Sequence, residues 1–257
     1  MKLSSLGLAL HITRRNWTVY KKDFIANISP TFADPLFFIL SLGLGLGAYI
    51  HDLSGKTYLQ FLAPGLAVST ALMTSFFETS YGFYVRMTFE NVYKAMLTTP
   101  INPREVILGE FIWVALKGAL MCLGVSLIFV CFGLVKNLAL LPLVLWIGAL
   151  VALGCGSLGL LASAYVKNIN QFQSVYSFFI SPLFFFSGIF FPIEQMPEAA
   201  RTIAYFFPLA HGVKISQAVY WDENVGHALL FHSSAMIAQI LVLGFLAMRA
   251  IEKRLTN

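Results

Sequence analysis

The alternation of apolar and polar stretches along the chain predicts six membrane-spanning helices. Each apolar stretch approaches or exceeds the roughly 20 residues that suffice to cross a bilayer as a helix, and short polar connections separate the stretches. The predicted spans are approximately 33–50, 58–84, 106–134, 138–165, 172–191 and 228–248. The sequence therefore predicts an all-α integral membrane protein, with residues 1–257 forming one transmembrane domain.

An amphipathic stretch over residues 3–22 precedes the first span. Its apolar face carries the residues Leu6, Ala9, Leu10, Trp17 and Tyr20. Several cations accompany these residues, and this combination is typical of a helix that lies along the membrane surface. We therefore expect an N-terminal interfacial helix; the alternative is a disordered basic tail.

The connection between the second and third spans carries a second amphipathic pattern, over residues 87–97. The residues expected to form a contact surface there are Phe89, Glu90, Val92, Tyr93, Lys94, Met96 and Leu97. Their apolar members recur at helical spacing, and Thr99-Pro100 closes the segment. We expect Tyr93 and Met96 to be apolar anchors for a partner protein. The alternative is a connector that rests on lipid, since amphipathy does not distinguish lipid from a protein groove.

The segment 193–210, after the fifth predicted span, combines aromatic residues with prolines and is too short to cross a membrane. We expect a short re-entrant hairpin on the outer side, where neighbouring protein satisfies its backbone. The residues that define this outer elbow are Ser187, Gly188, Phe190, Phe191, Pro192, Pro197, Pro208 and His211.

Composition agrees with a membrane protein, and the placement of charge predicts its orientation. Hydrophobic residues make up 58% of the chain and charged residues 11%, against roughly 25% charged in soluble domains. With the N-terminus inside, the inner segments hold twelve Lys and Arg residues: Lys2, Arg14, Arg15, Lys21, Lys22, Arg86, Lys94, Arg104, Lys167, Arg249, Lys253 and Arg254. The outer segments hold four: Lys56, Lys136, Arg201 and Lys214. This bias predicts that both termini are cytoplasmic.

Three ionisable residues, Glu78, Glu110 and Lys117, fall within the predicted spans. Such residues are costly in lipid and usually face protein or water. Glu110 and Lys117 are seven positions apart and therefore share a helix face. One interpretation is a polar gate at a substrate entry, and the other is a structural ion pair with snorkelling near the interface.

The sequence carries no pattern of a catalytic, nucleotide or metal site. Gly55-Lys56-Thr57 resembles the end of a phosphate-binding loop, but Ile50 stands where that motif needs glycine. The five histidines lack metal-ligand spacing. The three cysteines lie in apolar runs, which favours small buried side chains over disulfides. We therefore expect a protein that is not an enzyme and has no cofactor of its own.

Several stretches resemble the permease subunits of ABC-2 type exporters, and most closely the NodJ branch associated with lipo-oligosaccharide export. The matching stretches are ADPLFFILSLGLGLG (33–47), FETSY (77–81), AMLTTP (95–100), ILGE (107–110), SGIFFPIEQMP (187–197) and FFPLAH (206–211). This resemblance implies an interfacial N-terminal helix, six spans, a cytoplasmic coupling helix and an outer re-entrant hairpin. It also implies a homodimer in the bacterial inner membrane that works with two separate ATPase subunits, which bind ATP and Mg²⁺.

The resemblance implies export of an amphiphilic lipo-oligosaccharide, glycolipid or similar lipid-linked saccharide. We expect aromatic residues near the fifth span to contact such a cargo: Phe178, Phe184, Phe185, Phe186, Phe190 and Phe191. One alternative keeps the family and changes the cargo to a hydrophobic drug or antibiotic. Another is an ion-coupled secondary transporter, which would need paired broken helices and a carboxylate near the bilayer midplane.

Overall fold

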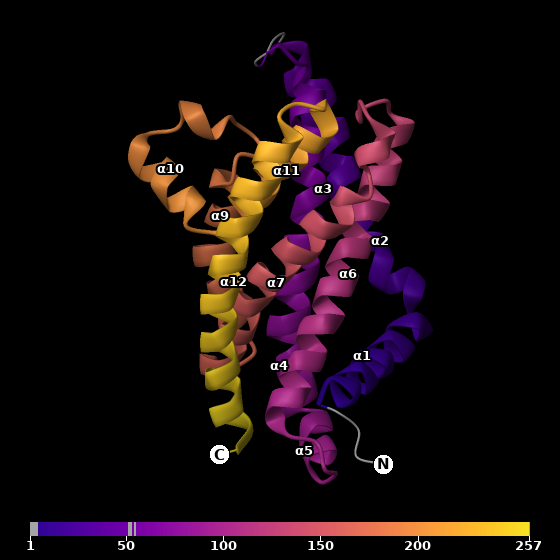
Figure 1. Ribbon diagram of the computed structural model, residues 1–257, viewed down its shortest axis with the longest axis vertical. Helices are drawn as coiled ribbons and strands as arrows, with labels where there is room; N and C mark the ends of the chain where they lie inside the picture. Colours follow the sequence, from indigo (N-terminus) through magenta and orange to yellow (C-terminus); the bar gives the residue numbers. More distant parts are fainter. Residues whose placement is uncertain (1–4, 51–52, 54, 257) are drawn as a thin grey trace.

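The computed structural model describes residues 5–50, 53 and 55–256, which form helices and no β-strand (Figure 1). The α-helices are α1 (Ser5–Lys22), α2 (Phe24–Phe38), α3 (Tyr58–Phe77), α4 (Phe83–Thr88), α5 (Val92–Leu97), α6 (Pro103–Cys131), α7 (Leu143–Tyr165), α8 (Gln171–Val175), α9 (Ser181–Phe186), α10 (Glu198–Tyr205), α11 (Pro208–Trp221) and α12 (Val225–Thr256). Segments of π-helix continue α2, α3 and α8: Ile39–Leu44, Glu78–Gly82 and Tyr176–Ile180. Short 3-10 helices cover Leu46–Ala48, Leu138–Leu140 and Ile193–Gln195.

Five helical runs in the described residues are long and apolar enough to cross a membrane. They are Phe24–Ala48, Tyr58–Thr88, Pro103–Cys131, Leu143–Tyr165 and Val225–Thr256. They correspond to five of the six predicted spans. The remaining predicted span, 172–191, forms the shorter run 171–186 through α8 and α9. This run ends early because Gly188 adopts φ +86°, which is outside the helical region. The side chain of Ile193 occupies the space where a β-carbon on residue 188 would lie.

The predicted boundaries differ from the observed ones most at the first span. The helix begins at Phe24 instead of residue 33, so Asp34-Pro35 lies inside it, as does Pro30. Proline is tolerated within a membrane helix when neighbouring groups satisfy the freed carbonyls. The second span also continues past residue 84, because the π-helical turn Glu78–Gly82 leads directly into α4. In the interfacial helix predicted over 3–22, residues 3 and 4 lie outside the described residues.

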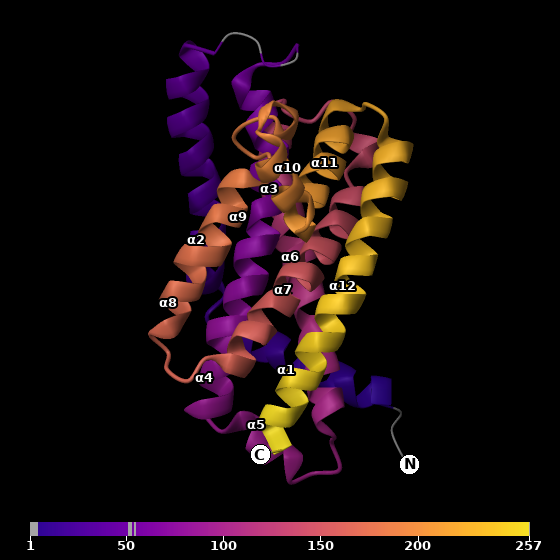
Figure 2. The same ribbon diagram turned by 90° about the vertical axis from the view of Figure 1, so that its left-hand side faces the viewer.

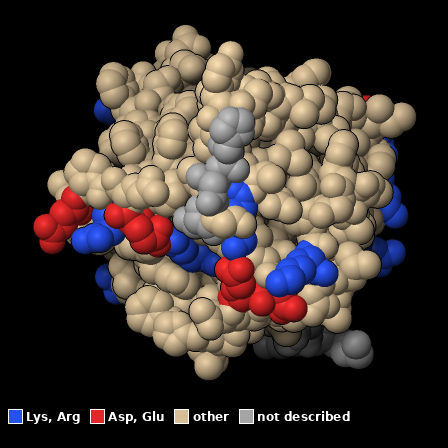
Figure 3. Space-filling view, turned by 90° about the horizontal axis from the view of Figure 1, so that it is seen from above, with Lys and Arg blue, Asp and Glu red and all other residues tan. Residues whose placement is uncertain are grey.

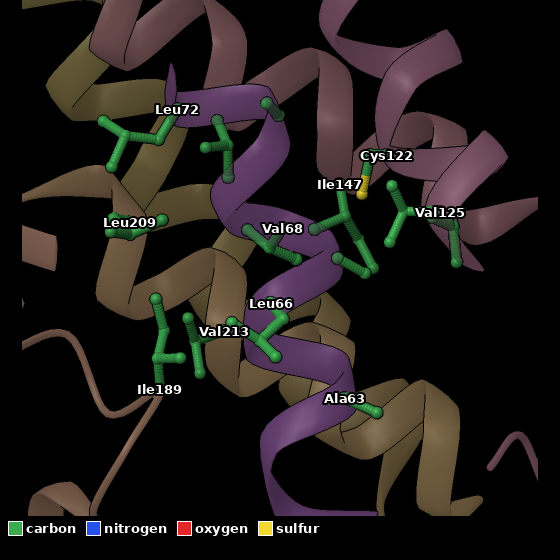
Figure 4. Packing of buried hydrophobic residues seen from close by; sticks show 14 of the residues in the cluster. Ala63, Leu66, Val68, Leu72, Cys122, Val125, Ile147, Ile189, Leu209 and Val213 are labelled. Atoms are coloured by element: carbon green, nitrogen blue, oxygen red, sulfur yellow. The ribbon is translucent and has the colours of Figure 1, made fainter. Parts of the chain in front are cut away.

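Helix α3 is the centre of the molecule, and 78% of its most apolar window is buried. Figure 4 shows Leu66 and Leu72 on one side of it, near Val213 and Leu209, and Ile147 on the other side. These residues belong to one apolar cluster that joins α3 to α6, α7 and α11. Helix α3 starts at a capping box, in which Thr57 accepts from the Gln60 backbone and Gln60 accepts from the Thr57 backbone.

The small residues of the fourth span allow α6 and α7 to approach closely. A β-carbon on Gly118 would lie 2.4 Å from the Ala152 β-carbon, and one on Gly148 would lie 2.9 Å from the Ala119 α-carbon. In the first span, only Gly43 makes such an approach, since a β-carbon there would lie 2.5 Å from Leu59 Cδ1, whereas Gly45 faces open space. Contacts between small residues therefore define the α6–α7 seam.

Helix α11 was not predicted, and it is a buried part of the core that packs against α3, α7 and α12. It begins with Pro208 in its first turn and ends where Asp222 adopts φ 57°. With 14 residues it is too short to cross a membrane. Its last residue also compensates for a proline in α3. Pro64 has no N–H for the Gln60 carbonyl four residues earlier, and the Trp221 indole N–H donates to that carbonyl at 3.2 Å.

The two ends of the molecule hold different elements. Helix α1 packs against α6 at the end of the molecule that also holds α5 and the C-terminal end of α12 (Figures 1 and 2). The opposite end, seen in Figure 3, carries a row of mixed acidic and basic side chains across the face, and further charged side chains lie at the edges of the view. Two ion pairs join α11 and its neighbours there, Lys56 with Glu223 at 2.9 Å and Lys214 with Glu194.

Candidate functional site

Four ionisable side chains from two helical segments meet near the end of the molecule that holds α5. We call Glu78, Arg86, Glu110 and Lys117 the charged cluster. Arg86 lies at its centre, with Nη1 2.7 Å from Glu78 Oε1 and Nη2 3.0 Å from Glu110 Oε2. Lys117 Nζ is 2.7 Å from Glu78 Oε2. The cluster therefore pairs two carboxylates with two cations, and its formal charge is zero.

Glu110 is the most enclosed member of the charged cluster. Its side chain is fully buried, so each oxygen must find a donor within the protein. Oε1 accepts from Asn16 Nδ2 at 3.0 Å and from the Tyr93 hydroxyl at 2.8 Å, and Oε2 accepts from Arg86. Glu110 thus connects α1, α4, α5 and α6 through one carboxylate.

Lys117 also contacts two aromatic side chains, Tyr20 of α1 and Trp113 of α6. Its Nζ lies 4.7 Å from the Tyr20 ring centroid and 5.9 Å from the Trp113 ring centroid, within the range of cation–π attraction. The sequence predicted that Glu110 and Lys117 share a face, and they do, but each pairs with a residue of the second span. The distribution of charge predicts Arg86 only as a cation of an inner connection, although it follows Glu78 by eight positions, about two helical turns.

The predicted coupling helix 87–97 is two pieces separated by a turn. Helix α4 ends at Thr88, Asn91 adopts φ 53°, and α5 then covers Val92–Leu97. Within this coupling segment, Glu90 and Lys94 are exposed, Val92, Met96 and Leu97 are partly buried, and Phe89 is 61% exposed. The exposed aromatic residue of the segment is therefore Phe89.

The prediction that Tyr93 anchors a partner protein is wrong in its geometry, because Tyr93 has no exposed surface. Its ring stacks on Phe83 with centroids 4.6 Å apart, and its hydroxyl accepts from Arg86 Nε at 2.9 Å while donating to Glu110. Burial, together with the negative charge of Glu110, raises the pKa of Tyr93 well above its usual value, so the hydroxyl keeps its proton. Tyr93 connects α5 to the charged cluster instead of projecting from it.

A cleft of about 720 Å³ extends from the charged cluster along the molecule. Its walls are α2, α3 and the run from α8 to α9, which lie side by side in Figure 2. Glu78, Arg86 and Lys117 line one part of it. The remaining lining mixes hydroxyl and amide groups and one carboxylate with aromatic and other apolar residues: Asn27, Thr31, Asp34, Ser69, Thr70, Thr74, Gln173, Ser181, Phe38, Phe77, Tyr81, Tyr176, Phe184, Phe185, Pro30, Pro35, Met73 and Gly82. Such a lining suits a molecule with both polar and apolar parts.

Two of the aromatic residues expected near a cargo, Phe184 and Phe185, line this cleft. Phe190 is buried and packs on Phe184, with ring centroids 5.3 Å apart. Phe178 and Phe191 are exposed. Phe186 is also exposed, and it does not line the cleft.

The residues of the predicted outer elbow lie in the connection between α9 and α10 and at the start of α11. Buried Ser187 donates to the Phe184 carbonyl at 2.8 Å, which closes α9. Pro192 is buried and Pro197, which precedes α10, is exposed. Pro208 starts α11 in close contact with α7, since a β-carbon on Gly154 would lie 2.6 Å from Pro208 Cγ.

His211, in α11, contacts both the end of α10 and α12. Its Nε2 lies 2.9 Å from the Tyr205 carbonyl, so Nε2 carries a proton, and its Nδ1 lies 2.8 Å from His232 Nδ1. Gln239 donates to the same carbonyl at 3.0 Å. These contacts attach the elbow to the long last helix.

Comparison with known proteins identifies the family to which these features belong. The ABC-2 type transporter family matches residues 8–221. The chain is 32% identical to Nodulation protein J of Rhizobium leguminosarum bv. viciae over 245 residues, which cover 95% of this chain and 93% of that protein. It is 30% identical to Nodulation protein J of Rhizobium meliloti, over 95% and 92% of the two chains.

A more distant relative is a transport permease of another bacterium. The chain is 24% identical to the inner membrane transport permease YadH of Escherichia coli, over 72% of this chain and 71% of that protein. The family match covers α2, α3, the charged cluster, the cleft and α11. The chain therefore belongs to the ABC-2 type transporter family and is a membrane-embedded permease.

Proposed function

We propose that this chain is the transmembrane subunit of an exporter that moves a lipid-linked saccharide or similar glycolipid across the bacterial inner membrane. The observation that carries the proposal is the cleft between α2, α3 and α8–α9. Hydroxyl and amide groups in this cleft suit a sugar head group, and aromatic rings suit an acyl chain. The relatives named Nodulation protein J support the same class of cargo, through the resemblance to lipo-oligosaccharide exporters.

In this proposal two copies of the chain enclose the pathway. The first membrane-spanning run, Phe24–Ala48, supports this arrangement, because it forms a wall of the cleft and only 17% of its most apolar window is buried within one chain. The last run, Val225–Thr256, is buried even less, at 11%, but it does not line the cleft. The cleft lies next to α2 and α9, so a second copy seated there would close it. The first span and the run from α8 to α9 then form the seam, with Phe37 and Phe185 among their exposed aromatic residues.

Energy comes from two separate ATPase subunits, which bind ATP and Mg²⁺. The coupling segment offers them an exposed surface that includes Phe89, Glu90 and Lys94. Beneath it, Tyr93 passes any displacement of α5 to Glu110 and Arg86 through two hydrogen bonds. Because Arg86 also bonds to Glu78, which lines the cleft, the charged cluster connects the proposed ATPase contact to the proposed cargo path.

The proposed orientation places α5 and both termini in the cytoplasm. Single cysteines introduced at Lys56, Arg201 and Lys94 into a chain without Cys122, Cys131 and Cys155 test it. We expect a membrane-impermeant maleimide applied from the periplasm to label positions 56 and 201, and position 94 only after the membrane is opened. Labelling of position 94 in intact spheroplasts would contradict the orientation.

Transport itself is measured with the permease and its ATPase reconstituted together in liposomes. We expect ATP to drive translocation of a fluorescent lipid-linked oligosaccharide, and we expect no translocation when the ATPase lacks its catalytic carboxylate. A hydrophobic drug that carries no sugar is the comparison cargo. If ATP drives movement of the drug and leaves the oligosaccharide in place, the saccharide proposal is wrong and the alternative cargo class replaces it.

A further inference from the structure

A second cavity, of about 310 Å³, lies between α1, the end of the second span and α6. It shares Asn27, Glu78, Tyr81, Arg86 and Lys117 with the main cleft, so the two cavities meet at the charged cluster. Helix α1 supplies its other side through Arg15, Asn16, Val19 and Tyr20. An amphiphile with its chain in the main cleft therefore has space for its head group beneath α1.

Two buried donors in the wall of this cavity have no partner among the described residues. They are the Tyr20 hydroxyl and the Trp113 indole N–H. Tyr20 is 5% exposed and Trp113 is 1% exposed, and their ring centroids are 5.6 Å apart. Burying a donor without a partner destabilises a protein, and two such groups in one wall therefore indicate a ligand that supplies acceptors.

The acceptors of Glu78 and Asn16 are already occupied, whereas the exposed carboxylates of Asp23 and Glu90 also line the cavity. Glu78 accepts from Arg86 and Lys117, and the Asn16 side-chain oxygen accepts from Arg15. Donor capacity also remains at Lys117, which has three N–H groups and makes one hydrogen bond. A ligand that fits accepts hydrogen bonds from the buried donors and donates to the exposed carboxylates, as the hydroxyl groups of a sugar do.

The charges that line the cavity balance one another. Its cations are Arg15, Arg86 and Lys117, and its anions are Asp23, Glu78 and Glu90. With no net charge, the cavity gives no general attraction to a phosphate or carboxylate. Tyr81, which is 49% exposed and lines both cavities, offers an aromatic face for the apolar C–H face of a sugar ring.

We propose that this cavity binds the first neutral sugar of the cargo, whose oxygens accept from the Tyr20 hydroxyl and the Trp113 indole N–H. The inference rests on the proposed function, because it specifies the head group of the same cargo. It adds that recognition occurs beneath the interfacial helix, beside the charged cluster. A bound sugar would satisfy two donors that are otherwise buried without partners.

The test uses purified full-length protein in amphipol and three probes that share one alkyl chain, each below its critical micelle concentration. The probes are decyl glucoside, decyl phosphate and a decyl ethylene glycol ether. We expect decyl glucoside to raise the Tm at the lowest concentration of the three. Stronger binding of decyl phosphate would mean an anionic head group, and an equal response to the ether would mean that only the chain binds; either result overturns the proposal.

Tyr20→Phe removes the hydroxyl and keeps the ring. We expect the ligand-free variant to be more stable than the wild type, because an unpaired buried hydroxyl is gone. We expect the half-maximal decyl glucoside concentration to rise about fivefold, the equivalent of one hydrogen bond. An unchanged half-maximal concentration overturns the proposal.

Tyr220→Phe is the matched control, since Tyr220 is fully buried and donates to Ser126 Oγ at 2.7 Å, away from the cavity. It should lower the Tm of the ligand-free protein and leave probe binding unchanged. The same shift of probe binding in Tyr220→Phe would show a general effect of stability and would overturn the proposal. These measurements need no ATPase, so they can fail while ATP-driven transport succeeds, and the reverse also holds.

Discussion

Replacing Glu110 by alanine is expected to destabilise the protein by about 3–5 kcal/mol, the usual cost of breaking a buried ion pair by removing one partner. The substitution leaves Arg86 with one carboxylate instead of two, and it removes the acceptor of Asn16 and Tyr93. The Tm of the purified permease should fall by on the order of 10 °C. Scanning fluorimetry in a fixed detergent measures this shift.

The matched control for this change is Glu90→Ala, which removes an exposed carboxylate that lines the cavity of about 310 Å³. It should move the Tm by less than about 2 °C, in keeping with the small effect of surface substitutions. A second test combines Glu110→Ala with Arg86→Met. Because the double variant leaves no Arg86 charge beside the lost carboxylate, it should lose less stability than the sum of the two single variants. Simple additivity would contradict the proposed pairing.

Replacing Phe89 by alanine is expected to weaken binding of the partner ATPase by about 2 kcal/mol, or roughly 30-fold in Kd. Phe89 is 61% exposed beside α5, so its truncation removes an aromatic contact without opening a cavity in the core. The Tm of the isolated permease should therefore stay within about 2 °C of the wild type. Titration of the purified ATPase onto immobilised permease measures the affinity.

Phe206→Ala is the control, because Phe206 is 75% exposed at the end of α10, far along the chain from the coupling segment. It should leave ATPase affinity unchanged. If Phe89→Ala binds the ATPase as tightly as the wild type, the segment is a connector that rests on lipid. Tyr93→Ala is a poor test of docking, since loss of a fully buried ring costs about 3–5 kcal/mol in the permease itself.

The contrast between Phe89 and Tyr93 shows how far helical periodicity reaches. Both residues fall on the predicted apolar stripe of 87–97, and periodicity assigns them the same environment. The left-handed turn at Asn91 separates them, so one ring faces outward and the other enters the bundle. Periodicity identifies an amphipathic segment, but it does not show which of its apolar residues the remainder of the protein covers.

The charged cluster likewise contains residues that the sequence singles out and partners that it does not. Glu78, Glu110 and Lys117 stand out because charges inside apolar spans are costly, and this cost is visible in the sequence. Their partners are not visible in the same way. Asn16 is an ordinary polar residue of α1, 94 positions from Glu110, and Arg86 is one cation among many near the predicted inner surface. The pairing depends on how α1 and α4 pack on α6.

The sequence by itself determined the class of this protein, the approximate bounds of five spans and the amphipathic segments at one end, because burial in lipid imposes length and composition on each helix separately. Tertiary structure alone decided the course of α11, the burial of Tyr93, the pairing within the charged cluster and the two cavities that meet there. The physical reason is that these features arise from contacts between distant segments, and side-chain periodicity within one helix carries no information about which helix lies beside it.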